Sequence, residues 1–147
     1  MRTLIIIFLT FFLTKCYSQD SASYKRYVDS ILIGRSKTKV KKIKTQVDGL
    51  HIRYFFQKAT RQLELIEVIQ PNKNDQIWIY NYHFINGKLS RMNKYNNHEV
   101  GDRKREIAFY YLKNSKIIYR EESKTQIDDI DNQLKRAEEL KLNAPKY

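Results

Sequence analysis

Tyr80-Asn81-Tyr82-His83-Phe84 is a five-residue sequence that recurs 28 residues earlier as Ile52-Arg53-Tyr54-Phe55-Phe56 and 28 residues later as Ala108-Phe109-Tyr110-Tyr111-Leu112. In each copy a Tyr is followed by one spacer and a large apolar residue, and then by a turn and a second apolar segment. A strand–turn–strand unit buries its apolar face only beside its neighbours, so a constant step predicts hairpins lying side by side. Three such hairpins predict an antiparallel β-meander of about six strands.

The alternation within these copies predicts which face of the sheet is buried. Residues two apart in a strand share a face, so the Tyr of each copy and its neighbours at ±2 line one side. Those nine positions are all apolar or Tyr: 52, 54, 56, 80, 82, 84, 108, 110 and 112. The opposite parity mixes polar and apolar residues, which predicts a partly wet face. Asn86-Gly87 is a strong hairpin-turn signal, and Asn114-Ser115 occupies the equivalent place.

Amphipathic stripes at both ends of the chain predict helices. Apolar residues at helical spacing run from Tyr24 to Leu32 and again from Ile127 to Ala137. The predicted fold class is α+β, with an N-terminal helix and a C-terminal helix packed on the sheet. The predicted division is a signal peptide (1–18) and a single α+β domain (19–147), which comprises a helix (19–34), a basic linker (35–49), the meander (50–121) and a helix (123–142).

The first 18 residues have the pattern of a secretory signal peptide. Arg2 precedes a short apolar run, Leu4 to Leu13, and small residues lead to a predicted cut after Ser18. This predicts a periplasmic or secreted protein. The alternative is a lipoprotein anchored through Cys16, since Leu13 stands three places before it, although Lys15 departs from that pattern. Membrane attachment is expected only in that case.

Charge narrows the class of partner. The chain has a net charge of +12, and removal of Arg2 and Lys15 with the signal leaves +10. After export the expected anions are an acidic protein or an anionic envelope component, rather than nucleic acid. The candidate patch is the densest basic run: Arg35, Lys37, Lys39, Lys41, Lys42 and Lys44. The run fits a solvated linker, an edge strand guarded by lysines, a helical face of Val40, Ile43 and Val47, or an anion-docking patch.

A second candidate surface is aromatic. Phe55, Phe109 and Tyr111 have the parity opposite to the core set. If they are exposed together they form an apolar patch that calls for a partner, and otherwise a loop or a second copy covers them.

Signals for chemistry are weak in this sequence. The histidines at 51, 83 and 98 lack the close spacing of helical metal pairs, the predicted mature chain has no cysteine, and no glycine-rich phosphate loop occurs. We therefore predict no catalytic residue, no cofactor and no metal site. The expected function is a non-enzymatic binding module of the cell envelope, in a specific variant an inhibitor or immunity-type protein. The alternatives are an enzyme acting on envelope glycans or phosphoesters, with His83 and Glu64 as its acid–base residues, and a structural subunit of an envelope complex.

One hairpin also carries a family resemblance. Tyr82-His83-Phe84-Ile85-Asn86-Gly87-Lys88-Leu89 resembles the Tyr-Tyr-Phe-x-x-Gly-Lys-Leu hairpins of small uncharacterised exported proteins of Bacteroidetes-type bacteria. That resemblance implies a signal peptide, a helix, a meander and a final helix. The chain is also faintly similar to the MORN-type repeats of antitoxin-related proteins, but it lacks their regular glycines, so no functional residue is carried over.

Overall fold

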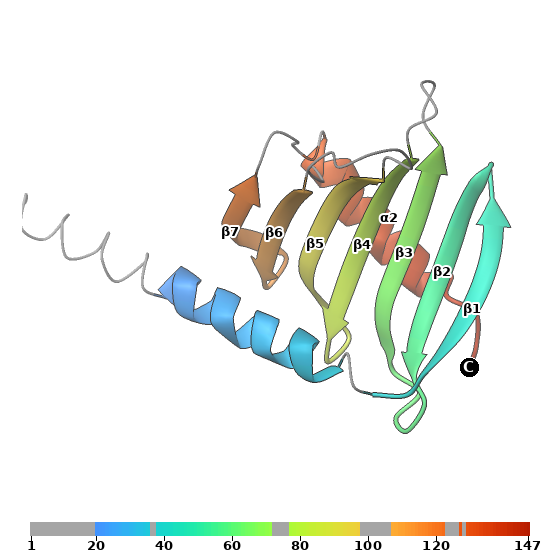
Figure 1. Ribbon diagram of the computed structural model, residues 1–147, viewed down its shortest axis with the longest axis horizontal. Helices are drawn as coiled ribbons and strands as arrows, with labels where there is room; N and C mark the ends of the chain where they lie inside the picture. The colour runs from blue at the N-terminus through green and yellow to red at the C-terminus, as the bar shows by residue number, and fades with distance from the viewer. Residues whose placement is uncertain (1–19, 36–37, 72–76, 98–106, 123–126, 128) are drawn as a thin grey trace, which may run out of the picture. The chain divides into compact units, whose positions relative to one another are not determined.

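The computed structural model describes residues 20–35, 38–71, 77–97, 107–122, 127 and 129–147. Residues 37–147 form one compact unit, and residues up to 36 form another, so each is described by itself. The larger unit is a seven-stranded sheet, entirely antiparallel, whose strands follow one another in chain order (Figure 1). The strands are β1 (Val40–Val47), β2 (Leu50–Gln57), β3 (Leu63–Pro71), β4 (Ile77–Ile85), β5 (Lys88–Asn97), β6 (Ile107–Lys113) and β7 (Lys116–Glu122).

The predicted hairpin repeat is confirmed by the register of the sheet. Tyr54, Tyr82 and Tyr110 lie in a single row across the strands, separated by Ile66 of β3 and Met92 of β5. All nine predicted core positions are buried and belong to one hydrophobic cluster. The predicted core face is therefore confirmed for β2, β4 and β6. On the opposite face, which was predicted to be partly wet, Ile79, Ile85 and Tyr111 are buried as well.

Each hairpin of the repeat contains a β-bulge at the same place. The register shifts between residues 55 and 56, 83 and 84, and 111 and 112, always one residue after the repeated Tyr. In each case the return strand holds one extra residue, Glu64, Ser90 or Ile118. The extra residue keeps apolar side chains on the core face on both sides of the bulge, as Leu89 and Met92 show on β5.

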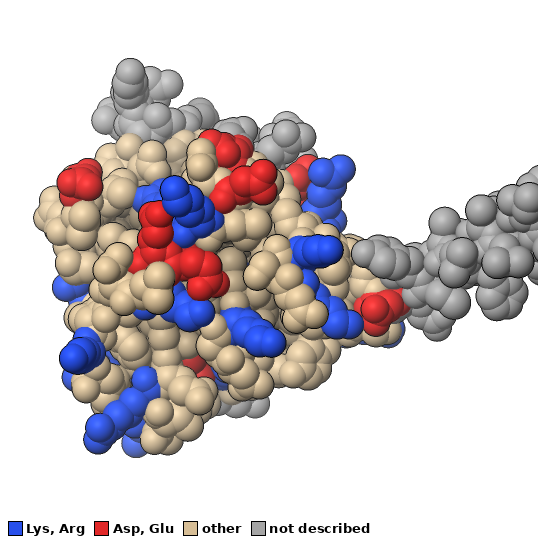
Figure 2. Space-filling model, turned by 180° about the vertical axis from the view of Figure 1, so that it is seen from behind, with Lys and Arg blue, Asp and Glu red and all other residues tan. Residues whose placement is uncertain are grey.

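The C-terminal helix, α2 (Ile130–Leu142), covers the face that carries the repeated tyrosines (Figure 1). Ala137 is fully buried, and Ile130, Leu134 and Leu140 pack against the core cluster. A helix was predicted over 123–142; in the structure Ile127 and Asp129 precede α2, and residues 123–126 and 128 lie outside the described residues. Figure 2 shows this face, on which basic and acidic side chains are interspersed.

Two repeated tyrosines attach the sheet to the C-terminal segment through their hydroxyls. The Tyr82 hydroxyl donates to Gln133 Oε1 on α2 at 2.6 Å. The Tyr110 hydroxyl donates to Glu122 on β7 and accepts the backbone N–H of Ile127 at 3.3 Å. Burial raises the pKa of both hydroxyls, and for Tyr110 the hydrogen bond to Glu122 adds to the rise.

The predicted basic linker, residues 35–49, is corrected by the structure, because Val40–Val47 form strand β1 and the sheet has seven strands instead of six. The connection to β2 is the two-residue turn Asp48-Gly49, with φ of 49° and 76°. Both residues have positive φ, the geometry that a tight hairpin requires and that Gly adopts without strain. Ile43 packs against the core, whereas Val40 and Val47 remain exposed. Of the interpretations of the run, the helical face is therefore wrong, and an edge strand is observed.

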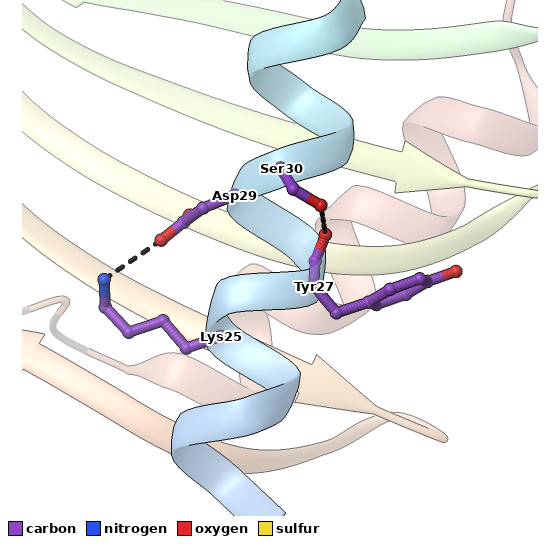
Figure 3. Close-up of polar contacts among 4 residues, drawn as sticks. All are labelled: Lys25, Tyr27, Asp29 and Ser30. Carbon is purple, nitrogen blue, oxygen red and sulfur yellow. Dashed lines mark hydrogen bonds and ion pairs between the residues drawn. The ribbon is translucent and has the colours of Figure 1, made fainter.

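The N-terminal helix spans residues 20–35, close to the predicted 19–34. Lys25 Nζ and Asp29 Oδ2 form an ion pair at 3.0 Å, one helical turn apart (Figure 3). The Ser30 hydroxyl donates to the carbonyl oxygen of Tyr27 at 2.8 Å, and the Tyr27 ring points away from the side that carries the ion pair. Within the described residues, no helix is both long enough and apolar enough to cross a membrane.

Candidate binding groove at the β1 end of the sheet

Strand β1 divides the candidate basic run between the two faces of the sheet. Lys41 pairs with Phe56 and places its Nζ 4.5 Å from the centre of the Tyr147 ring, on the face that α2 covers. Lys42 and Lys44 lie on the opposite face, where Lys42 Nζ is 5.3 Å from the centre of the Phe55 ring. Lys39 directly precedes the strand, Arg35 belongs to the N-terminal helix, and Lys37 lies outside the described residues. The three lysines of β1 therefore do not form one patch, since Lys41 lies on one face and Lys42 and Lys44 on the other.

A groove on the face opposite to α2 brings part of this run together with residues that the sequence did not single out. Its volume is about 420 Å³, within the range of small-molecule sites. We call it the β1–β4 groove; its lining residues are Lys44, Thr45, His51, Ile52, Arg53, Ile69, Ile77 and Ile79. The register explains the assembly, because His51, Ile69 and Ile79 are consecutive partners across three strands and Lys44 is paired with Arg53.

The groove is cationic at one end and apolar at the other. Lys44 and Arg53 come from β1 and β2, together with the exposed ring of His51. The isoleucines come from β3 and β4, and Ile79 is only 8% exposed. A surface of this kind offers hydrophobic contact along part of its length and positive charge at one end.

The two cations of the groove differ in what already neutralises them. Arg53 Nη1 lies 2.7 Å from Glu67 Oε1, and the two side chains are 35% and 14% exposed. This ion pair holds the guanidinium in place and offsets its charge. Within the described part of the chain, the Lys44 side chain makes no hydrogen bond or ion pair. The ammonium of Lys44 is therefore the positive charge that an incoming anion would meet.

The three candidate aromatic residues do not form a common surface. Phe55 is on β2, whereas Phe109 and Tyr111 are on β6, with three strands between. The Phe109 ring lies 5.6 Å from the Arg91 guanidinium, and Tyr111 packs edge-on against Tyr119 of β7. Phe55 thus belongs to the β1 end and the other two to the β7 end.

The residues of the enzymatic alternative are placed as follows. His83 Nε2 lies 3.1 Å from Asn93 Oδ1 and 3.3 Å from Arg91 Nη2, so an amide and a guanidinium surround it. Glu64 is the buried extra residue of the first bulge. Among the described residues, no group of three His, Cys, Asp or Glu side chains is arranged to hold a metal ion.

A second cavity, of about 510 Å³, lies where β7 meets the start of α2. Its lining includes Ile117 and Ile130, and also Glu122 and Ile127, which border residues outside the described part of the chain. The β1–β4 groove is lined by four strands of the sheet, and we therefore take it as the candidate site.

Comparisons of the chain with protein-family models, with curated proteins and with solved structures find no match. The candidate site consequently stands on its geometry and charge.

Proposed function

We propose that this chain is an exported, non-enzymatic binding module of the cell envelope that holds an anionic partner at the β1 end of its sheet. The observation that carries the proposal is the β1–β4 groove, in which the Lys44 side chain lies beside a preformed apolar floor. Export is supported by the N-terminal sequence, whose charged tip and short apolar run are typical of a signal peptide.

The lysines of β1 also have a structural explanation, because charges on an edge strand prevent it from pairing with other chains. Edge protection and anion binding differ in how they depend on the sign of the side-chain charge. A carboxylate guards an edge as well as an ammonium does, but it repels an anion. Charge reversal therefore removes binding and leaves the protection of the edge in place.

The test is capture of defined anionic probes, polyaspartate and vesicles containing phosphatidylglycerol, by the immobilised protein. The Lys42→Glu/Lys44→Glu variant changes the face that carries the groove, and we expect it to lower capture of one of these probes by about tenfold or more, since opposite-charge contacts become repulsive. The Lys39→Glu/Lys41→Glu variant makes the same change in net charge on the other side of β1, and we expect about a twofold loss at most.

Two results would contradict the proposal. Capture that is unchanged in the Lys42/Lys44 variant would show that this face does not bind the anion. Equal losses in both double variants would show that capture reflects net charge and not a site. Circular dichroism and gel filtration of both variants check that fold and solubility are retained.

A further inference from the structure

The β1–β4 groove has an asymmetry that constrains the chemistry of its ligand. From β1 to β4 there are three strand spacings, which makes the groove about 14 Å across. The cations occupy the β1–β2 end, and Ile69, Ile77 and Ile79 occupy the β3–β4 end. A ligand that matches both ends carries a negative charge at one end and an apolar chain at the other.

Because the backbone groups of the sheet are already hydrogen-bonded to neighbouring strands, a peptide is a poor ligand for the apolar end of the groove. Residues 65–69 of β3 are paired on both sides, with β2 and with β4, so at Ile69 the floor of the groove has its backbone hydrogen-bonding groups directed along the sheet. A peptide laid across the isoleucines would lose water from its own N–H and C=O groups without gaining partners, which is costly. An alkyl chain has no such groups and gains from every methylene that it buries.

We propose that the β1–β4 groove binds a single-chain anionic amphiphile, an alkyl carboxylate, with the carboxylate beside Lys44 and the chain over Ile69, Ile77 and Ile79. This inference rests on the proposed function and names the ligand class of the same site. Arg53 is already paired with Glu67, so among the described residues Lys44 is the cation of the groove that has no carboxylate partner.

The test is calorimetric titration of the full chain with butyrate, hexanoate, octanoate and decanoate, with octyltrimethylammonium and octanol as matched probes. We expect affinity to rise about two- to fourfold per added methylene until the chain fills the groove, since full burial of one methylene corresponds to about fourfold. Octanoate is expected to bind more tightly than octanol, and octyltrimethylammonium more weakly than either.

Three variants separate the contribution of the ligand's carboxylate from that of its alkyl chain. Lys44→Glu is expected to weaken octanoate about three- to tenfold and to leave octanol within about twofold. Ile69→Thr, a replacement that strands tolerate, is expected to weaken octanoate and octanol alike. Lys116→Glu, the same charge change on the exposed end of β7, is the control and is expected to leave both unchanged.

The inference is overturned if affinity does not depend on chain length, if octyltrimethylammonium binds as well as octanoate, or if Lys116→Glu weakens octanoate as much as Lys44→Glu. Binding to phosphatidylglycerol vesicles without binding to free decanoate also overturns it, because the site would then be a surface for lipid headgroups and not a groove for a chain. That last result would leave the proposed function standing, whereas failure of the anionic polymers and vesicles as well as the carboxylates would end both.

Discussion

At the scale of single residues, Tyr82 links the sheet to the helix that covers it. Its ring is fully buried in the core, and its hydroxyl reaches Gln133 on α2. Burial raises the pKa of this hydroxyl, and the nearby Arg136 opposes the rise. A buried phenol that keeps its proton is therefore part of what fixes α2 on the sheet.

This gives a prediction for stability at alkaline pH. Because the folded pKa of Tyr82 lies above the unfolded value of 10.0, its contribution is complete below that pH and is lost as the pH rises through the folded pKa. Tyr82→Phe should lower the free energy of unfolding near neutral pH by about 1 kcal/mol, through the lost hydrogen bond. It should also make the decline above about pH 10 shallower than in the wild type. Denaturant unfolding between about pH 8 and pH 11 measures both. Parallel declines in the two proteins would show that Tyr82 is not the group responsible.

At the scale of elements, the Asp48-Gly49 turn holds β1 on the sheet. Gly49 has φ of 76°, and a side chain there would meet no atom within 4 Å, so any cost of substitution comes from the backbone. Gly49→Val should destabilise the protein by about 1–3 kcal/mol, because a β-branched residue is strained at positive φ. Hydrogen exchange should show faster opening of β1 than of β4. Gly34→Ala, in the N-terminal helix, is the control and should be neutral or stabilising. Equal stability of the Gly49 variant and the wild type would contradict this account of the hairpin.

The strands could be predicted from the sequence wherever alternation and turn residues agreed. β4 and β5 carry the repeat and Asn86-Gly87, and both were predicted. β1 was predicted only as an alternative, an edge strand guarded by lysines, because the same run also fitted a solvated linker and a helical face. Asp48-Gly49 between apolar residues is itself a hairpin signal that favours the strand. The bulges had no such signal, because the extra residues Glu64, Ser90 and Ile118 share no chemical type.

Only part of the groove could be predicted from the sequence, because the register between strands decides which residues line it. Lys44 was a candidate from the local density of charge. Ile69 and Ile79 face the same groove because His51 pairs with Ile69 and Ile69 pairs with Ile79. Such partners are distant in sequence, and their meeting depends on the bulges and loop lengths between them. A single sequence shows the alternation within a strand but not which row of the next strand lies beside it.

At the scale of the whole molecule, the distribution of charge determines how an anionic ligand would arrive. The chain carries a net charge of +12, while the groove offers a single unneutralised ammonium among its described residues. The long-range field should therefore speed the encounter, and the local contacts should set the lifetime of the complex.

Raising the ionic strength from about 0.01 M to about 0.15 M shortens the Debye length from about 30 Å to about 8 Å. For polyaspartate or another acidic macromolecule, we expect the association rate to fall by about tenfold or more and the dissociation rate to change less. Stopped-flow or surface-based kinetics at several salt concentrations separates the two rates. The Lys42→Glu/Lys44→Glu variant should mainly increase dissociation, whereas Lys116→Glu should only slightly slow association. If salt acted mainly on the dissociation rate, the contacts in the groove would be the salt-sensitive ones. The assignment of the association rate to the long-range field and of the dissociation rate to the groove would then be wrong.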